Sequence, residues 1–189
     1  MQQLREFYKT KARENIRRKF NYKTIEQVPR ITKVVINVGF GKAAGNKKQI
    51  ELHMHELELI TGQKPVATKA KKSIAGFKIR EGAIIGAKVT LRHEYMFGFL
   101  SKLIHVSFPR VREFNGISMN AFDKNFNHTF GLQEQLVFPE ITYDQISDIR
   151  GYNVTVCFKN AKNKEVVIAL LAELGWPWRN YKEQGDANG

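Results

Sequence analysis

The sequence predicts an α+β fold in which helices pack on a mixed, mainly antiparallel sheet. Segments with apolar residues at three- and four-residue spacing alternate along the chain with short runs of β-branched residues. Apolar residues make up 42% of the 189 residues, which is enough to close a core. We therefore expect one domain over residues 1–180, followed by a flexible tail at 181–189.

The chain begins with a pattern that predicts helix, then strand, then helix. Residues 4–20 place apolar side chains on one helical face and basic side chains on the other. Pro29 separates this helix from Ile31–Val38, a continuous apolar run that is typical of a central strand. Asn46 and Gly62 suit the start and the end of a second helix.

The middle of the chain predicts an edge strand, a basic loop, a second strand and a third helix. Pro65–Lys69 suits an edge because proline cannot donate to a strand ladder. Cations and small residues alternate within Ala70–Gly86, which indicates an exposed and adaptable loop. Lys88–Arg92 then predicts a strand, and the apolar spacing over Phe97–Phe108 predicts a helix that stops at Pro109.

The last third predicts an irregular segment, one strand and one helix. Asn115–Phe130 is rich in Asn and Gly and is more consistent with an ordered excursion or hairpin than with a disordered linker. Tyr152–Phe158 alternates like a strand, and Val166–Leu174 forms an amphipathic helix before Gly175. The order of these elements predicts a ferredoxin-like (RRM-like) core.

Positive charge is concentrated in the first half of the chain. The formal net charge is +13, with 31 Lys and Arg against 18 Asp and Glu. Residues 1–50 carry 13 basic and 3 acidic residues, whereas residues 93–189 carry 10 and 11. One surface is therefore expected to face a polyanion such as nucleic acid, while the rest faces protein or water. No apolar run approaches the roughly twenty residues needed to span a bilayer, so no membrane partner is expected.

No catalytic, metal or cofactor site is predicted. Gly39–Gly45 lies between a strand and a helix, but its spacing is GxGxxxG, and a simple turn is the favoured interpretation. His53-Met54-His55-Glu56 lacks the second histidine of HExxH, because Leu59 stands there. Cys157 lies on an alternating strand, where a buried structural cysteine is favoured over a nucleophile. We expect no small-molecule substrate.

The basic loop is the strongest candidate for a binding segment. Cations neutralise phosphates, and an exposed aromatic can stack on a base or a sugar. The alternative is a solvated loop whose Phe77 tucks under the core, and the pattern alone favours nucleic acid only slightly. The candidate residues of the loop are Lys71, Lys72, Ser73, Phe77, Lys78 and Arg80.

Nine short motifs stand in a fixed order along the chain: Val28-Pro29-Arg30, Ile36-Asn37-Val38-Gly39, Ile60-Thr61-Gly62-Gln63-Lys64-Pro65, Lys71–Arg80, Lys88-Val89-Thr90-Leu91-Arg92, Phe108-Pro109-Arg110-Val111-Arg112, Glu134-Gln135, Phe138-Pro139-Glu140-Ile141 and Arg150-Gly151. In this order they resemble the ribosomal protein L5 family in its bacterial and organellar form. The resemblance covers about residues 1–180. Asp123-Lys124-Asn125-Phe126 departs from it by replacing a more Gly-rich turn, and Trp176-Pro177-Trp178 stands for a Phe-Pro-Phe ending.

The resemblance implies a structural, non-enzymatic protein of the central protuberance of the large ribosomal subunit. It implies binding to 5S rRNA and adjacent large-subunit rRNA, a contact between the basic loop and the elbow of the P-site tRNA, and a bridge to small-subunit head protein thirteen beside neighbouring central-protuberance proteins. Asn37, Gln63 and Thr90 match polar positions on the family's 5S-facing surface, and Lys33 and Arg92 would supply phosphate contacts.

Two rival functions stay open on the residues alone. A free-standing RNA-binding regulator or chaperone would usually show stacking motifs for single strands, and an RNA-directed enzyme would need a metal or an acid–base pair. Neither feature is evident, so the ribosomal interpretation is preferred. The expected location is the ribosome, in a bacterial cytoplasm or in an organelle that translates its own genome, either plastid stroma or mitochondrial matrix.

Overall fold

The computed structural model describes residues 2–41, 46–77, 79–142, 146 and 148–181. Its strands form one sheet in the order β2-β3-β1-β5-β4, and every neighbouring pair is antiparallel. The predicted sheet is thus confirmed, with antiparallel pairing throughout. The strands are β1 (Arg30–Gly39), β2 (Val66–Lys69), β3 (Ile84–Leu91), β4 (His128–Leu132) and β5 (Tyr152–Lys159).

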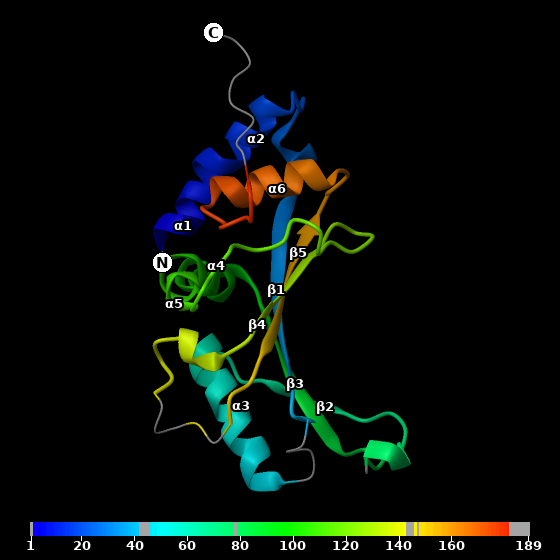
Figure 1. Cartoon of the computed structure of the whole chain (residues 1–189). Coiled ribbons are helices and arrows are strands. Elements are labelled where there is room, and N and C mark those ends of the chain that lie inside the picture. The colour runs from blue at the N-terminus through cyan, green and yellow to red at the C-terminus, as the bar shows by residue number, and fades with distance from the viewer. Residues whose placement is uncertain (1, 42–45, 78, 143–145, 147, 182–189) are drawn as a thin grey trace.

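The helices gather on one side of this sheet (Figure 1). None of those in the described part of the chain is long and apolar enough to cross a membrane. Two of the helical segments contain a π turn, η1 and η5, between regular helices. The segments are α1 (Gln2–Phe7), η1 (Tyr8–Ala12), α2 (Arg13–Lys19), α3 (Lys47–Thr61), α4 (His93–Lys102), η5 (Leu103–Ser107), α5 (Phe108–Arg110) and α6 (Lys164–Glu173).

The connectivity is that of a ferredoxin-like core with one added strand. β1-α3-β2 and β3-α4-β5 are two strand–helix–strand units, and their strands interleave in the order β2-β3-β1-β5. β4 extends the sheet beyond β5 at the opposite edge from β2. This arrangement leaves β1 at the centre and β2 at an edge, as the apolar run and Pro65 predict.

Local signals explain where the helices begin and how the first one is anchored. The side chain of Asn46 accepts a hydrogen bond from the Gln49 amide at 3.4 Å, and Gly62 ends α3 with φ of 68°. The predicted helix over residues 4–20 is observed with the π turn η1 inside it. At that turn the buried Tyr8 hydroxyl accepts a hydrogen bond from the Ile31 amide at 2.8 Å, which ties the helix to β1.

Two predictions about the second half need refinement. The third helix does not stop at Pro109 but runs to Arg110, because the proline lies in the first turn of α5, where its missing amide is tolerated. The segment Asn115–Phe130 does contain a hairpin, with a bridge between Phe122 and His128. It also begins β4, a five-residue edge strand that the density of Asn and Gly obscured.

Candidate nucleic-acid interface

The sheet has one covered face and one open face. Val34, Ile36 and Val38 of β1 point toward the helices and are at most 2% exposed. Asn37 and Gly39 alternate with them and are exposed on the other side. We define the open face by the strand residues on that side: Val66, Thr68, Gly86, Lys88, Thr90, Lys33, Val35, Asn37, Gly39, Asn153, Thr155, Cys157, Thr129 and Gly131.

The strand register aligns polar side chains across the open face. Asn37 stands directly opposite Lys88 of β3 and Asn153 of β5. One step along, Thr90 and Thr155 flank Val35, and the hydroxyl of Thr155 lies 2.9 Å from that of Thr129. Amides, hydroxyls and ammonium groups therefore occupy neighbouring positions across the sheet.

The open face carries no negative charge. None of the five strands contains Asp or Glu. Lys33 and Lys88 place cations on the face, and within the described residues neither forms an ion pair. A surface with free cations, neutral polar groups and no carboxylate attracts phosphate without local repulsion.

The predicted rRNA-binding residues fall into two positions relative to this face. Lys33, Asn37 and Thr90 lie on it. Gln63 lies in the exposed turn after α3, and its side-chain amide donates a hydrogen bond to the Thr90 carbonyl at 3.3 Å. Arg92 is exposed directly after β3, where strand alternation places it on the same side as Thr90. The structure thus places Lys33, Asn37 and Thr90 on the open face, with Gln63 and Arg92 next to Thr90.

Other polar residues of the open face were not singled out from the sequence. Lys88, Asn153 and Thr155 are as central as the predicted residues. The signal was present for each, because Lys88 alternates with Thr90 and Asn153 alternates with Thr155 within the predicted strands Lys88–Arg92 and Tyr152–Phe158. The first of these strands begins earlier than predicted, at Ile84, inside the segment expected to be loop. What was missing was the pairing of β1 with both β3 and β5, which makes these residues neighbours.

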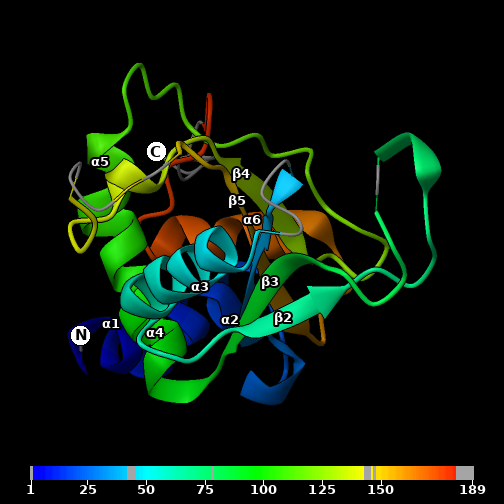
Figure 2. The ribbon, with the colours of Figure 1, turned by 90° about the horizontal axis from the view of Figure 1, so that it is seen from below.

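The basic loop forms a hairpin that stands away from the helices (Figure 2). Ile74 and Ile79 exchange two backbone hydrogen bonds, at 2.9 and 3.2 Å, around the short 3-10 turn Ala75–Phe77. The Ser73 hydroxyl accepts a further bond from the Glu81 amide at 2.9 Å. The loop therefore has a defined backbone and is more than an adaptable arm.

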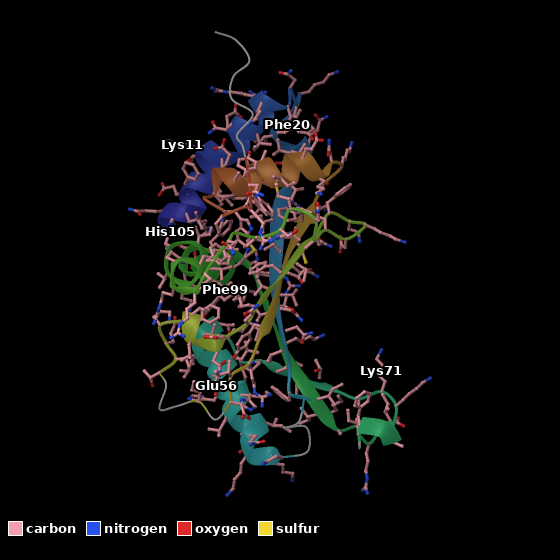
Figure 3. The ribbon with its side chains drawn as sticks, viewed as in Figure 1. Lys11, Phe20, Glu56, Lys71, Phe99 and His105 are labelled. Carbon is pink, nitrogen blue, oxygen red and sulfur yellow. The ribbon has the colours of Figure 1, made fainter. Side chains whose placement is uncertain are left out.

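The side chains of this hairpin point into solvent. Lys71, Lys72, Ser73 and Arg80 are exposed, and Figure 3 shows Lys71 far from the helix layer. Phe77 is 77% exposed, so the alternative in which it tucks under the core is wrong. Lys78 lies outside the described residues. An exposed phenyl ring between exposed cations is an arrangement that suits RNA.

The residues weighed for other chemistry occupy different environments. His53 is buried and His55 is exposed, so their side chains do not converge. Within the described ranges, no group of three His, Cys, Asp or Glu residues could hold a metal ion. Cys157 is half-buried on the open face, not fully buried as expected, and burial raises the pKa of its thiol. Residues 42–45 of the glycine-containing loop lie outside the described residues.

Comparison with known proteins shows the family to which this chain belongs. The family model described as ribosomal protein L5 matches residues 25–80, and the model for the C-terminus of the same ribosomal family matches residues 84–178. The large ribosomal subunit protein uL5 of Malacoplasma penetrans (strain HF-2) is 50% identical over 176 residues, which span 93% of this chain and 94% of that protein. The chain therefore belongs to the ribosomal protein L5 family, whose members are structural rather than enzymatic proteins.

Proposed function

We propose that this protein is a constituent of the large ribosomal subunit that binds 5S rRNA through its open face. The observation that carries the proposal is a sheet face on which lysine, asparagine and threonine meet with no carboxylate on any strand. The bacterial relative's description as a large-subunit protein supports the assignment to that subunit. The polar side chains are suited to RNA sugars and base edges, and the lysines to phosphates.

The composition of the open face favours structured RNA over single strands. RRM-type sheets stack unpaired bases on aromatic side chains. The open face as defined here contains Val, Thr, Gly, Lys, Asn and Cys but no aromatic residue. Recognition would then depend on hydrogen bonds and phosphate contacts along a folded RNA such as 5S rRNA and the adjacent large-subunit rRNA. This argues against a free-standing regulator that binds single strands.

The hairpin and the second half of the chain suit the remaining partners. Because the hairpin extends beyond the sheet and ends in Phe77 between cations, we assign to it the contact with the elbow of the P-site tRNA. Residues 93–189 are nearly neutral, with 10 basic and 11 acidic residues. That composition suits protein contacts, so we place the bridge to small-subunit head protein thirteen and the central-protuberance neighbours there.

Binding across a salt series tests the central proposal. The purified protein is titrated with 5S rRNA and with an unrelated RNA of equal length at increasing potassium chloride. We expect a preference for 5S rRNA that persists at moderate salt. For both RNAs the binding constant should fall as salt rises, with a log–log slope of roughly −0.7 to −0.9 per phosphate contact. Equal, salt-labile binding to both RNAs would reduce the protein to a basic surface and contradict the proposal.

A further inference from the structure

A recess continues the open face at one end of β1 and β5. Three elements surround it: the β1 residues around Thr32, the end of β5, and the turn Asp123–Asn127 that precedes β4. Lys33, Lys124 and Lys159 line it. Of these, only Lys33 is among the residues proposed above to bind RNA. The recess therefore adds two cations, Lys124 and Lys159, to the proposed interface.

The turn that carries Lys124 is held in place by its own hydrogen bonds. The Asp123 carboxylate accepts bonds from the amides of Asn125 and Asn127, both at 2.8 Å, and from the Asn127 side chain at 2.7 Å. The Asn127 side-chain oxygen in turn accepts a bond from the Phe158 amide at 3.0 Å, which attaches the turn to β5. Lys124 is therefore presented beside the sheet by a fixed backbone.

The strands on the other side of the recess are positioned by a bulge. The register between β1 and β5 shifts between Ile31 and Lys33, so that Thr32 is the extra residue. The Thr32 hydroxyl donates a hydrogen bond to the Cys157 carbonyl at 3.1 Å, and Lys33 stands opposite Cys157. The bulge thus sets Lys33 beside the end of β5, where Lys159 is exposed.

The recess holds a net positive charge, because its three lysines outnumber the one nearby carboxylate, that of Asp123. Lys33, Lys124 and Lys159 form no ion pair within the described ranges, and no Asp or Glu lines the recess. The nearby Asp123 carboxylate is directed to its own turn by the three bonds given above. Burial raises the pKa of the Cys157 thiol, so this residue adds no negative charge at neutral pH. Three ammonium groups around one recess favour an anion between them.

We propose that this recess binds a backbone phosphate of the RNA that lies on the open face. The inference rests on the proposed function, because it takes the RNA to follow the sheet from Asn37 past Lys33. Along a strand, those two residues are separated by about 13 Å, from a rise of about 3.3 Å per residue. The phosphodiester is shared by 5S rRNA and large-subunit rRNA, and the experiment separates the two.

The test compares two double variants of equal charge in the full-length protein. Lys124→Gln with Lys159→Gln removes the two new cations, and Lys11→Gln with Lys19→Gln removes two exposed cations from the helical side, where Figure 3 shows Lys11. Each is titrated with 5S rRNA and, separately, with large-subunit rRNA freed of protein and of 5S rRNA. We expect the first variant alone to lower the log–log salt slope by about 1, the change expected for the loss of one phosphate contact.

The outcomes separate this inference from the function on which it rests. A selective loss in the 5S arm or in the large-subunit arm supports the recess and identifies the source of the phosphate. If both variants show equal slopes with both RNAs while the wild-type protein still prefers 5S rRNA, the recess does not bind phosphate. The open-face proposal would then still stand. A wild-type protein without any preference for 5S rRNA would overturn both. Matching urea midpoints for the two variants exclude unfolding as the cause of a selective loss.

Discussion

The two faces of the same sheet differ in almost every physical property. On β1, Ile36 is 1% exposed among apolar neighbours, whereas the adjacent Asn37 is exposed between Lys88 and Asn153. The covered face closes the core, and in Figure 3 Phe99 lies within the helix-bearing side, far from Lys71 of the hairpin. From this contrast we expect that stability and the proposed RNA binding can be changed separately, at positions one residue apart.

The covered side also contains a polar exception. His53 and Glu56 of α3 are 1% and 4% exposed, and their side chains have no hydrogen-bond partner within the described residues. Their closest approach is 3.5 Å between Nδ1 and Oε2. Burial lowers the pKa of His53 to about 4 and raises that of Glu56 to about 7. Burial therefore favours the uncharged form of both residues, whereas the open face presents lysines to solvent.

The largest effect should come from the covered face. Ile36→Ala should lower the free energy of unfolding by about 2–5 kcal/mol, because it removes buried methyl groups and leaves a cavity. Asn37→Ala, the matched change on the open face, should alter it by no more than about 0.5 kcal/mol. Urea unfolding followed by circular dichroism measures both. Similar losses for the two variants would show that the open face also supports the fold.

A second effect should depend on pH. Between the ordinary Glu56 pKa of 4.5 and its folded value of about 7, the folded protein binds more protons at this site than the unfolded chain. The contribution of Glu56 to stability therefore falls as pH rises through that window. Glu56→Gln removes this loss. The free energy of unfolding of the variant minus that of wild type should therefore be larger at pH 8 than at pH 5, by about 1–3 kcal/mol.

His53 is present in both proteins, so its own pH dependence largely cancels in this comparison. Alone, a histidine with a pKa lowered to about 4 from 6.5 gives stability that is complete above 6.5 and is lost as pH falls toward 4. Glu51→Gln, on an exposed site of the same helix, is the control. The difference in unfolding free energy between variant and wild type is compared at pH 5 and pH 8. If this difference changes with pH by the same amount in Glu56→Gln and in Glu51→Gln, the buried carboxyl is not the source of the pH dependence.

Single polar changes on the open face should have a smaller effect, confined to RNA binding. Asn37→Ala and Thr90→Val should each weaken 5S rRNA binding about 2- to 10-fold, the range expected for the loss of a hydrogen bond. Thr24→Val changes an exposed threonine outside the sheet and should leave the dissociation constant unaltered. Binding curves at one salt concentration decide the matter. Unchanged affinity in both open-face variants would remove these residues from the interface.

The smallest effect on 5S rRNA should come from the hairpin. A variant that neutralises Lys71, Lys72, Lys78 and Arg80 together should retain nearly all of its 5S affinity, because the hairpin stands apart from the sheet (Figure 2). Ribosomes that carry it should bind P-site tRNA less tightly. Retained tRNA binding together with lost 5S binding would reverse the division between hairpin and open face.

Much of this organisation could be predicted because it depends on local patterns. Alternation in β1, β3 and β5 separates covered from open positions, and Asn46 and Gly62 mark the ends of α3. β4 could not be predicted as readily, since five residues at an edge carry little periodic signal beside a turn rich in Asn. The recess at Lys124 was missed for a different reason, because its cations come from three segments distant in sequence.

The amino-acid sequence was sufficient for the class of fold, the positions of most helices and strands, the excess of positive charge and the family. These follow from residue spacing, composition and ordered motifs, all of which are local or additive along the chain. The folded structure was needed to show that Asn37 lies between Lys88 and Asn153, that Phe77 is exposed, and that Lys33, Lys124 and Lys159 surround one recess. Those facts depend on pairing between distant segments, whose register is set by the packing of the whole core.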